Sequence, residues 1–303
     1  MKLAHYVKNE KTTVGMARNG LLFDVREASQ RLALPIRKDL LTIDQFLSAG
    51  AIGSLQQVEE KITGTSYGVP VDSVKLLSPI QNPEKILLIA VNYRSHSREQ
   101  NMEPPTSPYV FAKFKNALIG PGDPILIPKA SRKVDWEVEF AVIIGKAGKY
   151  IAKEDSMNYV AGYAIANDVS FRDFQYSTKL PDGETGLGLN WLKGKGLDSS
   201  FPLGPWLVTK DEIPNPHKLE ISLSVNGKRK QRSNTSDMIF KIESLIEYIS
   251  AGITLQPGDI ISTGTPGGVA AATGGPFLKD GDIVEGSIDR IGTLTNPVRA
   301  ESN

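Results

Sequence analysis

The stretch of sequence that decides the fold reads Val134-Asp135-Trp136-Glu137-Val138-Glu139-Phe140-Ala141-Val142-Ile143-Ile144. Every second position, counted from Val134, is apolar. The intervening positions begin with three carboxylates and then turn apolar at Ala141. A period of two that is carried by β-branched and aromatic residues predicts a strand with one face in the core. Because the second half is apolar on both faces, we expect a central strand rather than a wet edge strand.

Asp135, Glu137 and Glu139 occupy positions i, i+2 and i+4, so a regular strand would project all three from one face, roughly 7 Å apart. Like charges at that separation repel unless a cation lies among them or one carboxylate is protonated. A solvated outer face is the alternative. No Lys or Arg follows on the carboxylate face. We therefore favour a divalent cation bound at this strand.

The length and the charge of the chain limit which classes of protein it can belong to. The chain has 303 residues, 40% of them hydrophobic and 23% charged, which allows one large domain or two unequal ones. Lys and Arg (35) nearly balance Asp and Glu (34), and no basic tract or long apolar run occurs. We therefore expect no nucleic-acid partner and no membrane association.

The chain has no cysteine, which excludes disulfides, thiolate metal sites and a cysteine nucleophile. Carboxylates and the three histidines, His5, His96 and His217, remain as metal ligands, and they favour a hard ion such as Mg²⁺, Mn²⁺ or Ca²⁺. The first residues resemble a strand and not a signal peptide. Cytoplasmic location is the default expectation, and the mitochondrial matrix is the alternative if a presequence has been removed.

The predicted fold class is α+β, mostly β, in two parts. Residues 1–75 predict a small α/β module with strands near 2–7, 13–17 and 21–24 and helices over 43–49 and 56–63. Two prolines between residues 78 and 83 predict an extended link. Residues 80–303 predict a larger domain of many short strands with few helices, of which 240–251 is the clearest. Residues 92–105 and 180–196 are expected to be loops.

Asp168 follows a predicted strand at 160–165 and is the candidate third carboxylate. A strand-terminal Asp is by itself more often a turn former. With Glu137 and Glu139 on a neighbouring strand, however, it would supply three oxygens and leave positions for a chelating ligand. That arrangement is typical of a Mg²⁺ site.

His96 and Glu99 are separated by three residues and can meet only if their segment is helical. A carboxylate bonded to one imidazole nitrogen orients the ring and leaves the other nitrogen to take a proton. A surface histidine in a polar loop is the simpler alternative. The pair gains interest because it follows the buried strand predicted at 85–91.

Two glycine-rich segments are further candidates. Lys195 lies between Gly194 and Gly196, where its amine could approach an anion, although simple solubility also explains it. The spacing does not match a phosphate loop. Residues 264–268 form a predicted tight loop whose amides could bind an oxyanion, although a plain turn is the alternative.

An ordered set of motifs resembles the fumarylacetoacetate hydrolase superfamily, most closely its fumarylacetoacetate hydrolase domain-containing branch of acylpyruvases and oxaloacetate tautomerases. The resemblance runs from about residue 80 to the end of the chain. Its motifs are Asn92-Tyr93 with His96 and Glu99, Asp135-Trp136-Glu137-Val138-Glu139, Asn167-Asp168-Val169-Ser170 with Arg172, Asp173 and Gln175, Trp191-Leu192 with Gly194-Lys195 and Asp198, Pro202-Leu203-Gly204-Pro205, and Ser262-Thr263-Gly264-Thr265-Pro266.

The resemblance implies a mixed β-roll in the C-terminal domain and a homodimer. It also implies Mg²⁺, or Mn²⁺ or Ca²⁺, bound by Glu137, Glu139 and Asp168. The family places a catalytic His–Glu dyad on a lid that becomes helical when ligand binds, here His96 and Glu99. It places substrate-binding residues at Gln175, Lys195 and Thr265, with Lys195 also catalytic. Departures at Ala90-Val91 and Phe114 bear on substrate preference.

The function expected from this resemblance is Mg²⁺-dependent hydrolysis of a C–C bond in a small 2,4-diketo acid of the acylpyruvate or fumarylpyruvate type. His96 and Glu99 would activate water, and Lys195 and Thr265 would stabilise the oxyanion. The alternatives at the same site are oxaloacetate tautomerisation, decarboxylation or a related isomerisation. A non-catalytic protein with a structural cation is a further alternative.

Overall fold

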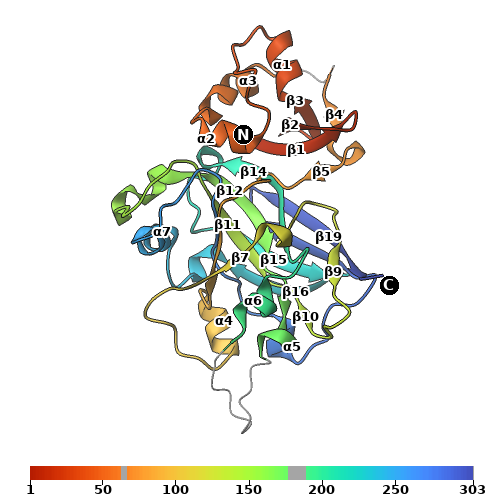
Figure 1. The fold of residues 1–303 in the computed structure, drawn as a ribbon, viewed down its shortest axis with the longest axis vertical. Coiled ribbons are helices and arrows are strands. Elements are labelled where there is room, and N and C mark those ends of the chain that lie inside the picture. Colours follow the sequence, from red (N-terminus) through yellow and green to blue (C-terminus); the bar gives the residue numbers. More distant parts are fainter. Residues whose placement is uncertain (63–66, 177–188, 303) are drawn as a thin grey trace.

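The computed structural model describes residues 1–62, 67–176 and 189–302. Figure 1 shows the elements of residues 2–77 gathered at one end of the molecule and the other strands and helices below them. Many short strands and a few short helices make up the fold, which confirms the predicted α+β, mostly β class. The division into a module at 1–75 and a domain at 80–303 stays a prediction.

The principal sheet has twelve described strands. Its main path runs in the order β4 (Val69–Pro70), β3 (Leu21–Asp24), β2 (Lys11–Arg18), β1 (Lys2–Lys8), β14 (Phe201–Thr209), β12 (Val160–Asn167), β11 (Val138–Ile144), β17 (Ile260–Ser262), β6 (Ile86–Ala90) and β7 (Tyr109–Lys113). Two short strands lie off this path, β5 (Leu76–Leu77) beside β1 and β8 (Leu118–Ile119) beside β14. The sheet therefore continues from the N-terminal elements into the rest of the chain, through the pairing of β1 with β14.

A second sheet and a short ribbon complete the β-structure. The second sheet has the order β16 (Lys228–Asn234), β15 (Glu220–Val225), β18 (Ile283–Ile288), β19 (Gly292–Ala300) and β9 (Ile125–Ile127). The ribbon pairs β10 (Val134–Asp135) with β13 (Ser170–Phe171). Asn226 and Gly227 both have positive φ at the hairpin between β15 and β16, as this dipeptide predicts.

Strand β11 is central and buried on both faces, as its sequence predicts. Phe140 and Val142 belong to one hydrophobic core, and Ala141 and Ile143 belong to another on the opposite face of the sheet. Burying each large apolar side chain contributes roughly 1.5–3 kcal/mol. The two cores therefore fix the register of β11 against both of its neighbours, since a one-residue slip would exchange the two faces.

The predicted continuous strand over residues 134–144 is wrong in one respect, because it is broken at Trp136 and Glu137. Asp135 belongs to the β10–β13 ribbon and accepts hydrogen bonds from the amides of Ala270 and Ala271, at 2.8 and 3.0 Å. These amides begin the short helix α8 (Ala270–Thr273). Because Asp135 accepts from these amides, its side chain does not join the cluster that contains Glu137 and Glu139.

The described helices are short. They are α1 (Val25–Arg31), α2 (Ile43–Ser48), α3 (Gln56–Lys61), α4 (Arg94–Glu99), α5 (Arg172–Gln175), α6 (Trp191–Lys195), α7 (Ile242–Ser250) and α8. The predictions of α2, α3 and α7 are confirmed, although Thr63 lies outside the described residues. The predicted loops at 92–105 and 180–196 are wrong where α4 and α6 form, and residues 180–188 lie outside the description.

His5 connects β1 to two other segments of the N-terminal part. Its Nδ1 lies 3.1 Å from the carbonyl oxygen of Ser78, and its Nε2 lies 2.9 Å from the amide nitrogen of Ile43 at the start of α2. A carbonyl only accepts and an amide N–H only donates, so the ring is neutral with its proton on Nδ1. His5 is therefore a buried structural residue and not a metal ligand.

Replacement of His5 by Ala should lower the free energy of unfolding by roughly 1–3 kcal/mol at pH 8, because two buried polar groups lose their partner. Burial lowers the pKa of His5 below its usual 6.5. The stability that the neutral ring contributes is therefore complete above pH 6.5 and is lost as the pH falls below that value.

Urea unfolding at pH 8 and pH 5.5 measures this effect. The loss of stability on acidification should be smaller in His5→Ala than in the wild type. His217→Ala, at a partly exposed histidine, is the control. An equal loss in wild type and His5→Ala would contradict this role of His5.

Candidate active site

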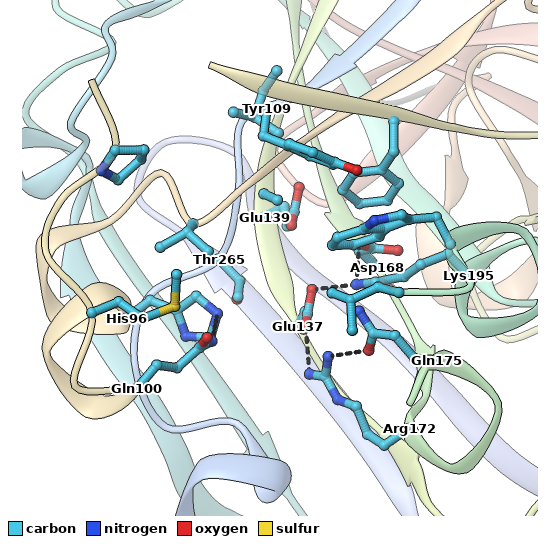
Figure 2. A pocket seen from close by; sticks show the side chains of 18 of the residues that line it. His96, Gln100, Tyr109, Glu137, Glu139, Asp168, Arg172, Gln175, Lys195 and Thr265 are labelled. Carbon is cyan, nitrogen blue, oxygen red and sulfur yellow. Dashed lines mark hydrogen bonds and ion pairs between the residues drawn. The ribbon is translucent and has the colours of Figure 1, made fainter. Parts of the chain in front are cut away.

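A cavity of about 420 Å³ lies between helix α4 and the ends of β11 and β12. Figure 2 shows its two sides, with His96 of α4 and Gln100, which follows this helix, opposite Glu137, Asp168, Lys195 and their neighbours. Its volume falls within the range of small-molecule sites in proteins. The cavity is therefore the candidate active site.

Glu137, Glu139 and Asp168 meet at the floor of this cavity. Each offers a carboxylate oxygen that lies within 4.8 Å of the others, and all three side chains are buried. The pairing of β11 with β12 brings them together: Val138 lies opposite Asn167, so the residues flanking this pair are neighbours across the two strands. The convergence expected from the sequence is present, and the role of these residues as metal ligands stays a proposal.

Three buried cations surround the carboxylates, although the acidic strand itself carries no Lys or Arg. The Lys195 ammonium lies 2.7 Å from Glu137 and 2.5 Å from Asp168. The Arg172 guanidinium bonds Glu137 and Asp135, and the Lys113 ammonium lies 2.8 Å from Asp168. These cations come from α6, α5 and β7, so the pattern of the acidic strand gives no sign of them.

Glu139 is the carboxylate with no Lys or Arg ion pair among the described residues. Ser262 and the amide of Gly264 donate to its Oε2, at 2.5 and 3.0 Å. Burial, with Asp168 and Glu137 close by, raises the pKa of Glu139 well above its usual range. Including Asp135, four carboxylates thus face three cations. The hard oxygen donors, with one negative charge in excess when all four carboxylates are ionised, fit a divalent cation.

The position of Lys195 depends on close packing of α6 against α5. A Cβ on Gly194 would lie 2.6 Å from the Cβ of Gln175, so only glycine allows this approach. Burial alone would lower the pKa of Lys195, but Asp168 and Glu137 outweigh it and raise the pKa. Lys195 therefore remains charged at the floor of the cavity.

Lys113 differs from Lys195 because it is held mainly by neutral oxygens. Its ammonium donates to the carbonyl oxygens of Val169 and Ser200, at 2.8 and 2.5 Å, as well as pairing with Asp168. Burial lowers the pKa of Lys113 to about 8 despite the attraction of Asp168. This lysine holds Asp168 and the chain after β12 in place.

The His96–Glu99 pair forms on one face of α4, as the three-residue spacing requires. His96 Nδ1 lies 2.5 Å from Glu99 Oε1, and the amide of Gly268 donates to Glu99 Oε2 at 2.6 Å. An ionised carboxylate only accepts, so His96 carries its proton on Nδ1. The side-chain amide of Gln100 lies 2.7 Å from His96 Nε2, to which it donates. Nε2 thus carries the lone pair that a general base needs.

Asn92 fixes the segment that leads from β6 to α4. Its side chain accepts from the amide of Phe240 and donates to the carbonyls of Phe240 and Thr263. Gly264, with φ of +90°, lies so close that a Cβ there would approach the Cβ of Asn92 to 2.8 Å. These contacts hold the dyad and the donor to Glu139 in one framework.

The other sequence-predicted site residues also line the cavity. Gln175 accepts a hydrogen bond from Arg172 through Oε1. The Thr265 hydroxyl donates to the carbonyl of Val138 and accepts from Gln231. Substrate contacts for both remain predictions. Of the three histidines, only His96 lines the described cavity. His217 instead pairs with Glu243.

Sequence reasoning missed Lys113 and Gln100 and noted Arg172 only within a motif. The signal for Lys113 was its position at the end of the short strand 109–113. A lysine that is buried there must pair with an anion or with hydrogen-bond acceptors. Gln100 follows Glu99 directly and gave no signal, because its contact with His96 forms only when residues 94–99 are helical.

The family model described as fumarylacetoacetate (FAA) hydrolase C-terminal matches residues 85–299. A mitochondrial oxaloacetate tautomerase, fahd2, of Xenopus laevis is 46% identical over 255 residues, which are 84% of this chain and 77% of the relative. A 2,4-didehydro-3-deoxy-L-rhamnonate hydrolase of Sphingomonas sp. (strain SKA58) is 41% identical over 262 residues, 85% of each chain.

Solved structures show the same fold. The fumarylacetoacetate hydrolase of psychrophilic Exiguobacterium antarcticum superposes with a TM-score of 0.81 at 28% identity, over 99% of this chain and all of that chain.

Among the described residues, none of the helices combines the length and the apolar character that crossing a bilayer requires.

Replacement of Glu139 by Gln should weaken divalent-cation binding at least tenfold, because a carboxylate ligand is lost. Thermal melting with Mg²⁺, Mn²⁺ or Ca²⁺ and with a chelator measures this. A saturating ion should raise the melting temperature of the wild type. In chelator, the variant should melt no lower than the wild type, since one buried like charge has been removed.

Glu154→Gln, at an exposed carboxylate that is not part of this cluster, is the control and should respond to the ions as the wild type does. A wild-type melting temperature that none of the three ions changes would rule out a cation site at this cluster.

Proposed function

Because this chain belongs to the fumarylacetoacetate hydrolase superfamily, we propose that it is an enzyme that transfers a proton at C3 of a small 2-oxo acid, the carbon beside the oxo group. The observation that carries this proposal is a neutral imidazole, His96, oriented by Glu99 across the cavity from a cluster of buried carboxylates. A base on one side and a charged floor on the other are what enolisation needs.

Glu137, Glu139 and Asp168 are the residues that would hold a divalent cation, with Mg²⁺ as the first choice and Mn²⁺ or Ca²⁺ as alternatives. When bound, such an ion supplies a Lewis acid that polarises the oxo group of the substrate. The donor set is all oxygen, and the chain has no cysteine to favour a softer metal.

His96 acts as the general base in this proposal. Its Nδ1–H bond to Glu99 fixes the ring and leaves Nε2 to accept a proton from C3 or from the enol hydroxyl. The proton is then returned to the other atom, so the reaction interconverts the oxo and enol forms with no net loss. Gln100 must turn away from Nε2 first, because its amide now bonds the lone pair.

Lys195 and Gln175 would bind the oxygens of the oxo acid. The Lys195 ammonium is buried and already lies among Glu137 and Asp168, so it needs no reorganisation to stabilise negative charge. Gln175 is oriented by Arg172, which leaves its side-chain NH₂ as a donor. Thr265 remains a proposed substrate contact.

Tautomerisation of oxaloacetate is the first candidate reaction, and it is supported by relatives that are named oxaloacetate tautomerase. Hydrolysis of an acylpyruvate, the first expectation from the sequence, is the second candidate. A relative named as a hydrolase supports it, as does a cavity with room for a distal acyl group. In that reaction His96 takes a proton from water as the water attacks the C4 carbonyl. The C3–C4 bond then breaks to give a carboxylic acid and the enolate of pyruvate, and the proton on His96 converts this enolate to pyruvate.

A homodimer stays a proposal from the family resemblance. The location also stays open between cytoplasm and mitochondrial matrix, and relatives named as mitochondrial support the second.

Replacement of His96 by Ala should lower kcat for enol-to-keto conversion of oxaloacetate by roughly 10²–10⁴-fold, because the proton-transfer group is lost. Glu99→Gln should cause a smaller loss, since the ring keeps a partner. Enol absorbance, followed with and without Mg²⁺ against the uncatalysed rate, measures the conversion.

Arg98→Ala is the matched control, because Arg98 is an exposed residue of the same helix that does not line the cavity. It should retain wild-type activity. Full activity in His96→Ala, on both oxaloacetate and acetylpyruvate, would refute the base assignment.

A further inference from the structure

Three aromatic side chains form a continuous wall on the outer part of the cavity. The ring centroids of Phe111 and Trp191 are 4.6 Å apart with planes inclined by 28°, and those of Tyr109 and Trp191 are 5.3 Å apart. All three line the cavity. Neither the carboxylate cluster nor the His96–Glu99 dyad accounts for this wall.

The wall is attached rigidly to the floor of the site. Tyr109 and Phe111 are two residues apart on β7, so they project from the same face of that strand. Trp191 and Lys195 are four residues apart on α6, so they lie on the same face of the helix. The Lys195 ammonium lies 5.4 Å from the Phe111 ring. The wall therefore begins where the charged floor ends.

The outer rim of the cavity is apolar and open to solvent. The exposed fractions of Tyr109 and Met102 are 52% and 49%, although both line the cavity. Exposed apolar side chains at the mouth of a concave site are typical of surface that a ligand covers. The wall therefore has the character of a distal subsite.

The described part of this cavity offers no unpaired Lys or Arg to a second carboxylate. Lys195 pairs with Glu137 and Asp168. Arg172 donates through Nε, Nη1 and Nη2 to Asp135, Gln175 and Glu137. A carboxylate next to the aromatic wall would lose its hydration without gaining a counter-ion, which is unfavourable.

We infer that the wall of Tyr109, Phe111 and Trp191 is a specificity subsite for a planar, uncharged group. Among 2-oxo acids with a group beyond C3, the preferred substrates are then those in which this group is aryl or conjugated, such as aroylpyruvates, rather than small alkyl. Flat π-systems stack favourably on such rings. This inference rests on the proposed function, because it requires the oxo-acid end to lie at the carboxylate floor.

Benzoylpyruvate and acetylpyruvate test the inference, because they differ only in a phenyl or methyl group at the distal carbonyl. We expect kcat/KM of the Mg²⁺-loaded wild type for interconversion of the oxo and enol forms to be at least tenfold higher for the phenyl compound than for the methyl compound. Trp191→Ala should reduce the phenyl-to-methyl ratio at least tenfold, mainly through KM. Trp191→Phe, which keeps a ring, should retain most of it.

Leu192→Ala is the control, because Leu192 is the adjacent residue of α6, is 57% exposed and does not line the cavity. Its ratio should equal that of the wild type. Thermal melting identifies any variant that fails to fold, in which case Trp191→Phe and a Tyr109→Ala variant carry the test.

A ratio near one in the wild type, or an equal loss for both compounds in Trp191→Ala, would overturn the subsite while leaving the proposed chemistry intact. If the wild type turned over none of benzoylpyruvate, acetylpyruvate and oxaloacetate, the proposed function itself would be overturned.

Discussion

The structure depends on one constraint: carboxylates that repel one another are held together by the pairing of β11 with β12. Glu137 and Asp168 flank a fixed cross-strand pair, so they cannot separate without breaking the central sheet. Lys195 relieves their repulsion, but Glu139 has only neutral donors, and burial beside Asp168 and Glu137 raises its pKa well above the usual range. Folding energy from two hydrophobic cores thus sustains an electrostatic arrangement that would not assemble alone.

The two sides of the cavity differ in how they are supported. The floor belongs to the central sheet and is buried on both faces. The His96–Glu99 dyad belongs to a six-residue helix, which is anchored through Asn92 and the amide of Gly268. A rigid charged floor beside a base on a small, separately anchored helix suits a reaction in which substrate enters between the two.

The sequence predicted the central strand and the meeting of Glu137, Glu139 and Asp168, because alternation and strand adjacency are local properties. It did not predict the break at Trp136, because that break comes from hydrogen bonds of Asp135 to helix α8, over a hundred residues away. Helices α4 and α6 are too short for apolar periodicity to reveal them. The pairing of Lys113 with Asp168 was also hidden, because the two residues are far apart in the sequence.

The pairing of β1 with β14 has a consequence for how the chain is made. Lys2 lies opposite Val208, so the first strand is synthesised about two hundred residues before its neighbour in the sheet. Strand β5 can already pair at His5 and Tyr6, but until β14 leaves the ribosome the edge of β1 at Lys2 and Leu3 offers unpaired backbone groups to other nascent chains. Completion of this sheet is therefore a late, long-range event, and contacts of such large sequence separation slow folding. The N-terminal strand must remain unaggregated until the rest of the chain has been translated.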